Sequence, residues 1–120
     1  MALALAAGLI DLGFALFHAA FHRLFGWPER LAPSGSLNTA ITQTLNAMLI
    51  FVFLAYGATL IWLSGQGSSV HPVLPLVGAA FWGLRLALQF IWFDLKPWPS
   101  KLIAAVFAVT AVVHLLAIRV

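Results

Sequence analysis

Residues 48–55 read MLIFVFLA, and this run decides the fold of the chain. It holds no polar side chain and lacks the polar–apolar alternation of a membrane barrel strand. It lies inside a longer apolar stretch, residues 37–63, which exceeds the roughly 20 residues a helix needs to cross a hydrocarbon core about 30 Å thick. A backbone in lipid must satisfy its own hydrogen bonds, and a helix does so within one segment. The stretch therefore predicts a transmembrane helix.

Three further apolar stretches, residues 3–25, 73–93 and 102–118, predict three more spanning helices. The breaks between the four are clusters of Gly, Pro and Ser, which interrupt helices. Ser36 and Ser100 precede apolar runs and are predicted N-caps. The expected fold is an all-α integral membrane protein. It is a four-transmembrane-helix bundle with short loops, built as a single transmembrane domain over residues 1–120.

The composition agrees with this class. Of 120 residues, 63% are hydrophobic and 8% are charged, whereas soluble domains carry about 25% charged residues. The chain has no cysteine, which excludes disulfides and thiolate chemistry. The net charge of +3 is not gathered into a basic patch, so nucleic acid is not an expected partner. The lipid bilayer is the expected partner, and the cytoplasmic (inner) membrane is the expected location if the source is bacterial.

The basic residues predict an orientation in the membrane. Arg23 and Arg30 lie in or beside the first connection and Lys96 and Lys101 in or beside the third, while the second holds neither Lys nor Arg. Cytoplasmic loops carry an excess of Lys and Arg. The first and third connections are therefore predicted to be cytoplasmic, with both termini on the non-cytoplasmic side.

Polar side chains inside the first three stretches recur at spacings of three, four and seven, which places them on one face of each helix. Such residues are costly in lipid and are candidates for function. We expect these faces to turn inward and to line a polar pocket between the first three helices. The predicted ligand-binding residues are His18, His22, Gln43, Asn46, Trp82, Arg85 and Gln89.

The leading functional hypothesis is a membrane protein that binds or transports a small polar or anionic ligand, with proton coupling as an option. Arg85 would neutralise the charge of the ligand, and the amides would orient it. His18 or His22 would carry protons, because histidine titrates near neutral pH. Four helices form a thin wall around a pathway, so a homo-oligomer is expected. The small residues Ala104, Ala108 and Ala111 suit close packing in a scaffold or an oligomer contact.

Three alternatives are open. The chain could be an intramembrane enzyme acting on a lipid-soluble substrate, with His18 and Asp11 as general acid and base and Arg85 stabilising negative charge. It could be a structural subunit of a membrane complex. The polar residues could also serve packing alone, with Asp11 paired to Arg85 and both histidines bonded to amides of Gln43, Asn46 or Gln89.

No cofactor and no metal are predicted. His18 and His22 do have the spacing of two zinc ligands on one helix, so a haem or a divalent metal at His18 and His22 is a minor alternative. A metal site would need a third strong ligand, and the sequence offers no cysteine for it.

Overall fold

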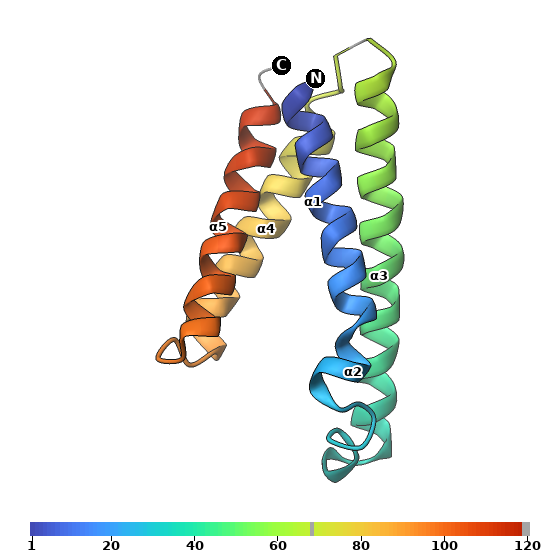
Figure 1. Cartoon of the computed structure of the whole chain (residues 1–120), viewed down its shortest axis with the longest axis vertical. Coiled ribbons are helices and arrows are strands. Elements are labelled where there is room, and N and C mark those ends of the chain that lie inside the picture. The colour runs from blue at the N-terminus through green and yellow to red at the C-terminus, as the bar shows by residue number, and fades with distance from the viewer. Residues whose placement is uncertain (68, 119–120) are drawn as a thin grey trace. The chain divides into compact units, whose positions relative to one another are not determined.

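Long helices make up most of the computed structural model, which describes residues 1–67 and 69–118 (Figure 1). Every regular element in those residues is helical: α1 (Ala2–Ala19), α2 (Phe21–Phe25), the 3-10 helix η1 (Ala32–Ser34), α3 (Ser36–Gly65), α4 (Val73–Trp92) and α5 (Trp98–Ala117). Helices α1, α3, α4 and α5 are each long and apolar enough to cross a membrane. The predicted all-α class with four such helices is thus confirmed. Membrane insertion and the side of the termini stay predictions.

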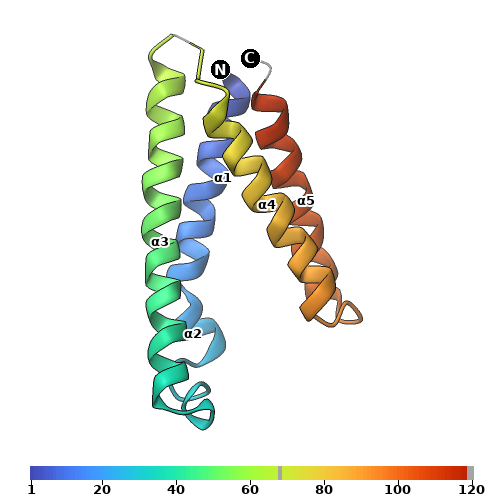
Figure 2. The same ribbon diagram turned by 180° about the vertical axis from the view of Figure 1, so that it is seen from behind.

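The chain divides into two compact units, which are described separately. The α1–α3 unit comprises Gly8–Thr59. The α4–α5 unit comprises Met1–Ala7 and the described part of Leu60–Val120. Both views show α1 beside α3 and α4 beside α5 (Figures 1 and 2). A single transmembrane domain over residues 1–120 stays a prediction.

Small residues let α1 and α3 approach closely in the α1–α3 unit. Gly8 and Gly57 are buried, and a Cβ atom built on Gly57 would lie only 2.8 Å from the backbone oxygen of Gly8. Farther along the two helices, the buried rings of Phe14 and Phe53 meet with centroids 6.0 Å apart. Close backbone approach through small residues is a common way of packing helices in membranes.

The stretch predicted as one helix over residues 3–25 is divided at Ala20 into α1 and α2. The Ala20 N–H is shared between the carbonyl oxygens of Leu16 and Phe17, at a donor–acceptor distance of 3.1 Å to each. The regular α-helical hydrogen-bond pattern is therefore disturbed at Ala20, but the Ala20 N–H keeps its acceptors. Helix α2 ends at Gly26, whose left-handed conformation (φ 64°, ψ 41°) closes the helix. A glycine adopts this conformation without the Cβ clash that other residues suffer.

In the α4–α5 unit, the two helices pack through an aromatic pair. The rings of Trp82 and Phe107 are both buried and stack with centroids 5.7 Å apart and an interplanar angle of 22°. The buried face of α5 consists of Ala104, Phe107, Thr110, His114 and Ala117. Of the predicted alanine stripe, Ala104 belongs to this face, whereas Ala108 and Ala111 are half-buried. Buried His114 contacts the main-chain oxygen of Thr110 through Nδ1 at 2.8 Å.

Helix α5 begins at Trp98, four residues before the start predicted from the sequence. The break predicted before residue 102 includes Pro99, but this proline occupies the first turn of α5, where a proline loses no intrahelical hydrogen bond. The prediction that Ser100 is an N-cap is therefore wrong. The cap position is Pro97, which makes no side-chain cap bond, and the Ser100 hydroxyl contacts Gln89 instead. Ser36, the other predicted N-cap, is the first residue of α3.

We expect Gly57→Ala to lower the free energy of unfolding by about 1–3 kcal/mol, the usual range for overpacking. The new methyl group would meet the backbone of Gly8, which can move only if the helices separate. Thermal unfolding in detergent, followed by circular dichroism, measures the loss. Gly13→Ala on α1 is the matched control, because nothing lies within 4 Å of its new methyl group. Equal melting temperatures for the two variants would contradict the close approach.

Candidate functional site

His18 and Asn46 form a two-point contact between α1 and α3. The Asn46 Nδ2 donates to the main-chain oxygen of His18 at 3.0 Å, and the Asn46 Oδ1 lies 2.8 Å from His18 Nδ1. Because this amide nitrogen faces a carbonyl, the amide oxygen faces the imidazole. An amide oxygen only accepts, so the His18 Nδ1 carries the proton and donates it. The contact fixes both the ring orientation and the tautomer of His18.

His22 and Gln43 make a single-point contact one helical turn farther along, between α2 and α3. The His22 Nε2 lies 3.1 Å from Gln43 Oε1, and the Gln43 Nε2 donates to the main-chain oxygen of Thr39 at 3.4 Å. The same reasoning makes Nε2 of His22 the protonated nitrogen. His22 is exposed, so this contact is more open than that of His18. Both histidines thus contact amides of the predicted set Gln43, Asn46 and Gln89, with Asn46 and Gln43 as the partners, while a role in packing alone stays a prediction.

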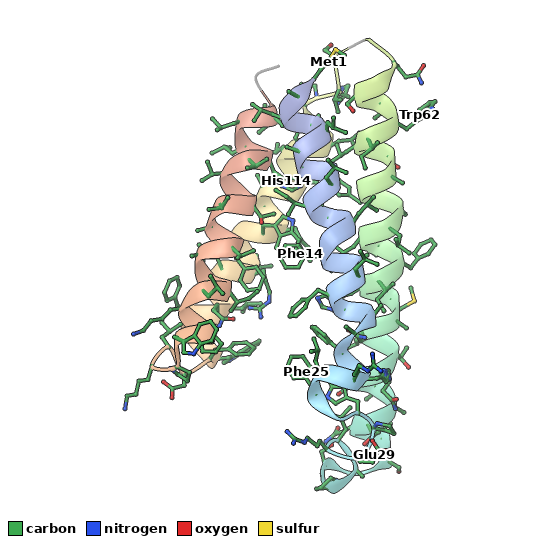
Figure 3. All side chains as sticks on the ribbon, in the orientation of Figure 1. Met1, Phe14, Phe25, Glu29, Trp62 and His114 are labelled. Atoms are coloured by element: carbon green, nitrogen blue, oxygen red, sulfur yellow. The ribbon has the colours of Figure 1, made fainter. Side chains whose placement is uncertain are left out.

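Aromatic rings surround the histidines of the α1–α3 unit. The His18 ring stacks on Phe21 at 4.3 Å with an interplanar angle of 29°, and it lies 5.2 Å from the Phe53 ring. The His22 ring meets Trp27 edge to face at 5.8 Å. Figure 3 shows the neighbouring Phe14 and Phe25 projecting from the same side of the α1–α2 stretch. The His18 imidazole is therefore packed against aromatic rings, whereas His22 is exposed and meets the Trp27 ring edge to face.

Arg85 on α4 lies among aromatic rings of its own unit. The centre of its guanidinium is 4.4 Å from the Phe107 ring centroid and 5.0 Å from that of Phe93. Such cation–π contacts stabilise a cation but provide no hydrogen-bond acceptor in the plane of the guanidinium. The Arg85 Nη1 is buried and has no hydrogen-bond partner among the described residues. The Nη1 atom of Arg85 is thus a buried cationic hydrogen-bond donor that lacks an acceptor among the described residues.

Gln89, one turn beyond Arg85, supplies the complementary group. Its side chain is 1% exposed, and its Nε2 donates to Ser100 Oγ on α5 at 2.9 Å. Its Oε1 is buried and finds no donor in the part of the chain that the structure describes. An unsatisfied buried polar atom typically costs about 1–3 kcal/mol. An unpaired donor and an unpaired acceptor therefore lie one helical turn apart on α4, near the stacked Trp82 and Phe107.

The predicted ligand-binding residues fall into two groups. His18, His22, Gln43 and Asn46 lie in the α1–α3 unit, where direct contacts pair them. Trp82, Arg85 and Gln89 lie in the α4–α5 unit. A shared pocket, a pairing of Asp11 with Arg85, and acid–base roles for His18 and Asp11 all stay predictions. Asp11 itself is buried on α1, with 1% of its surface exposed.

Sequence reasoning missed three residues of this site, namely Phe93 and Phe107 beside Arg85 and Ser100 beside Gln89. The phenylalanines carry no signal that separates them from the other eight in the chain. Ser100 is predicted as an N-cap because it precedes the apolar run that starts at residue 102. Recognising Pro99 as a first-turn residue would have placed Ser100 inside α5, where its hydroxyl can reach a neighbouring helix.

The described residues contain no group of three or more His, Asp or Glu side chains placed to hold a metal ion. One nitrogen of each ring, Nδ1 of His18 and Nε2 of His22, is already bonded to an amide oxygen. Binding of a haem or a divalent metal at His18 and His22 stays a prediction.

A double-mutant cycle should reveal the strength of the His18–Asn46 contact. We expect His18→Ala and Asn46→Ala to show a coupling energy between about 0.6 kcal/mol, the average for polar contacts between membrane helices, and about 1.7 kcal/mol, the largest such value. The equivalent cycle on His22 and Gln43 should give a smaller value, because that contact is exposed. Unfolding in mixed micelles with added denaturing detergent provides the free energies. A larger coupling for His22 and Gln43 would contradict the two-point geometry of Asn46.

No family model matches the chain, and no curated protein or solved structure shows significant similarity to it.

Proposed function

We propose that this chain is a small integral membrane protein that binds, and transports, a small polar or anionic ligand. Arg85 is the residue that neutralises the charge of the ligand. The observation that carries the proposal is the pair of unsatisfied buried atoms, Arg85 Nη1 and Gln89 Oε1, on the apolar helix α4. An ionisable side chain in an apolar span is costly and rare, and it is by default a candidate for a ligand or ion pathway.

The electrostatics of the α4–α5 unit favour an anion beside Arg85. The rings of Phe93 and Phe107 cover the guanidinium without supplying negative charge. Asp94, in the connection that follows α4, accepts a hydrogen bond from the Lys96 main-chain N–H at 3.0 Å and so stabilises its own turn. A carboxylate or phosphate oxygen would give Arg85 Nη1 its acceptor, and charge-assisted bonds of this kind are the strongest available to a guanidinium.

We assign a proton-coupling role to His18 and His22. Each ring is held by an amide in one orientation, with one N–H committed to that bond. Fixed orientation favours proton transfer through the second ring nitrogen, because no reorganisation of the ring precedes it. A homo-oligomer completes the proposal, since four helices alone form a thin wall around a pathway.

The chain is proposed to lie with the α1–α3 and α4–α5 connections in the cytoplasm and both termini outside. Four exposed basic residues lie in or beside these connections: Arg23 on α2, Arg30, Lys96 and Lys101. Trp92 and Trp98 flank the α4–α5 connection and are 75% and 73% exposed. Exposed Trp beside Lys is typical of the membrane–water interface.

Substitution of Arg85 tests the proposed function. Protein-dependent benzoate uptake into proteoliposomes under an inward proton gradient, taken above the uptake of protein-free liposomes, should fall at least tenfold in Arg85→Gln, because the ligand loses its charged partner. Arg23→Gln is the matched control, since Arg23 is exposed on α2. Acetate and phosphate are run alongside benzoate. If the wild-type protein neither binds nor moves any of the three anions, or if Arg85→Gln moves them equally well, the proposal is wrong.

Single cysteines test the orientation, and the natural absence of cysteine makes the background clean. Ser34→Cys reports on the α1–α3 connection and Ser69→Cys on the α3–α4 connection, and both positions are exposed. In intact cells, a membrane-impermeant maleimide should label Ser69→Cys and spare Ser34→Cys. Labelling of both variants after permeabilisation is the control. The reverse pattern would overturn the assignment.

A further inference from the structure

We propose that the side-chain amide of Gln89 can turn over while it stays bonded to the Ser100 hydroxyl. The site beside Arg85 can then hold head groups that accept hydrogen bonds and head groups that donate them. This inference rests on the proposed function and names its ligand class: small carboxylic acids with an apolar body, and their amides. It depends on contacts inside the α4–α5 unit alone.

The first step concerns the bond between the two residues. Gln89 Nε2 donates to Ser100 Oγ, so the opposite edge of the amide, Oε1, is left without a partner. A hydroxyl both accepts and donates, whereas an amide carries its donor and its acceptor on separate atoms. If the amide turns over, Ser100 Oγ–H donates to Oε1 and the bond to α5 is kept. The edge away from Ser100 then presents the NH₂ group instead of the oxygen.

The second step concerns what each orientation would bind. With Oε1 presented, Gln89 accepts from a ligand O–H or N–H while Arg85 donates to the ligand carbonyl. With Nε2 presented, Gln89 and Arg85 both donate to an ionised carboxylate. The protonated acid or its amide fits the first arrangement, and the carboxylate fits the second. In both arrangements, Arg85 Nη1 and the presented edge of Gln89 gain the partners that they lack.

The third step concerns the body of the ligand. The guanidinium lies against Phe93 and Phe107, and Trp82 stacks on Phe107 with an interplanar angle of 22°. A head group that reaches Arg85 therefore carries its body past aromatic rings, which favours a planar or apolar body. Benzoate and benzamide have the same planar body and differ in whether the head group can donate, so they are suitable probes.

The test compares the dissociation constants of these two probes in phosphatidylcholine nanodiscs at pH 8, where benzoate is fully ionised. The wild-type protein should bind both. Gln89→Met should weaken both by about tenfold, the effect of one ordinary hydrogen bond. If Gln89 could present only its oxygen, the same substitution would weaken benzamide alone and leave benzoate unchanged or tighter. That result would overturn the inversion.

Ser100 is a positioning residue in this scheme, and its variants give a second measurement. Ser100→Ala should weaken both probes severalfold, and Ser100→Thr, which keeps the hydroxyl, should restore both affinities to within about threefold of wild type. Ser64→Ala is the control, because the Ser64 hydroxyl is shielded at least as well as that of half-buried Ser100 but bonds to the main-chain oxygen of Ile61. If Ser100→Ala leaves both affinities unchanged, Ser100 plays no part in binding and the inference is wrong.

The outcomes separate this inference from the proposed function. If benzoate binds in an Arg85-dependent way but benzamide does not, the inversion fails and anion binding stands. If neither probe binds, or if Arg85→Gln leaves benzoate affinity unchanged, both fail. If Gln89→Met lowers the melting temperature but alters neither affinity, Gln89 serves α4–α5 packing alone.

Discussion

A polar side chain on an apolar helix must find its partner within the protein, and this constraint organises both units. In the α1–α3 unit it is met by matching, since Asn46 and Gln43 accept from the two histidines and use their NH₂ groups on main-chain oxygens. In the α4–α5 unit it is met only in part. Gln89 reaches Ser100, yet its oxygen and the Arg85 Nη1 find no partner among the described residues. The amides of Asn46 and Gln43 in the α1–α3 unit thus have their partners within the protein, whereas two buried polar atoms of the α4–α5 unit do not.

The helices themselves were readable from the sequence, because runs such as residues 48–55 allow no other spanning element. Spacing also indicated which polar residues share a face, and His18 and His22 do meet amides of α3. Which amide meets which histidine depends on the register of α1 against α3. The close approach of Gly8 and Gly57 helps to set that register, and it cannot be predicted from the residue type at either position alone.

The surroundings of Arg85 were beyond sequence reasoning for a different reason. Phe93 follows the end of α4 in an extended conformation, and from there its ring lies 5.0 Å from the guanidinium. The position of the Phe93 ring therefore depends on the backbone angles after the helix end, which helical spacing does not predict. The N-cap prediction for Ser100 followed the start of the apolar run, whereas α5 begins two residues before Ser100, at Trp98, with Pro99 in its first turn.

Three antiparallel contacts of α1 and α2 with α3 together fix the register of these helices. Gly8 meets Gly57, His18 meets Asn46, and His22 meets Gln43, so the residue numbers of each pair add up to 64 or 65. Sliding one helix past the other by a turn, about 5.4 Å, would break all of these contacts at once. Sliding of α1 and α2 along α3 is therefore opposed by three separate contacts, two on α1 and one on α2. Any motion of this hairpin that preserves the contacts is a tilt of both helices as one body.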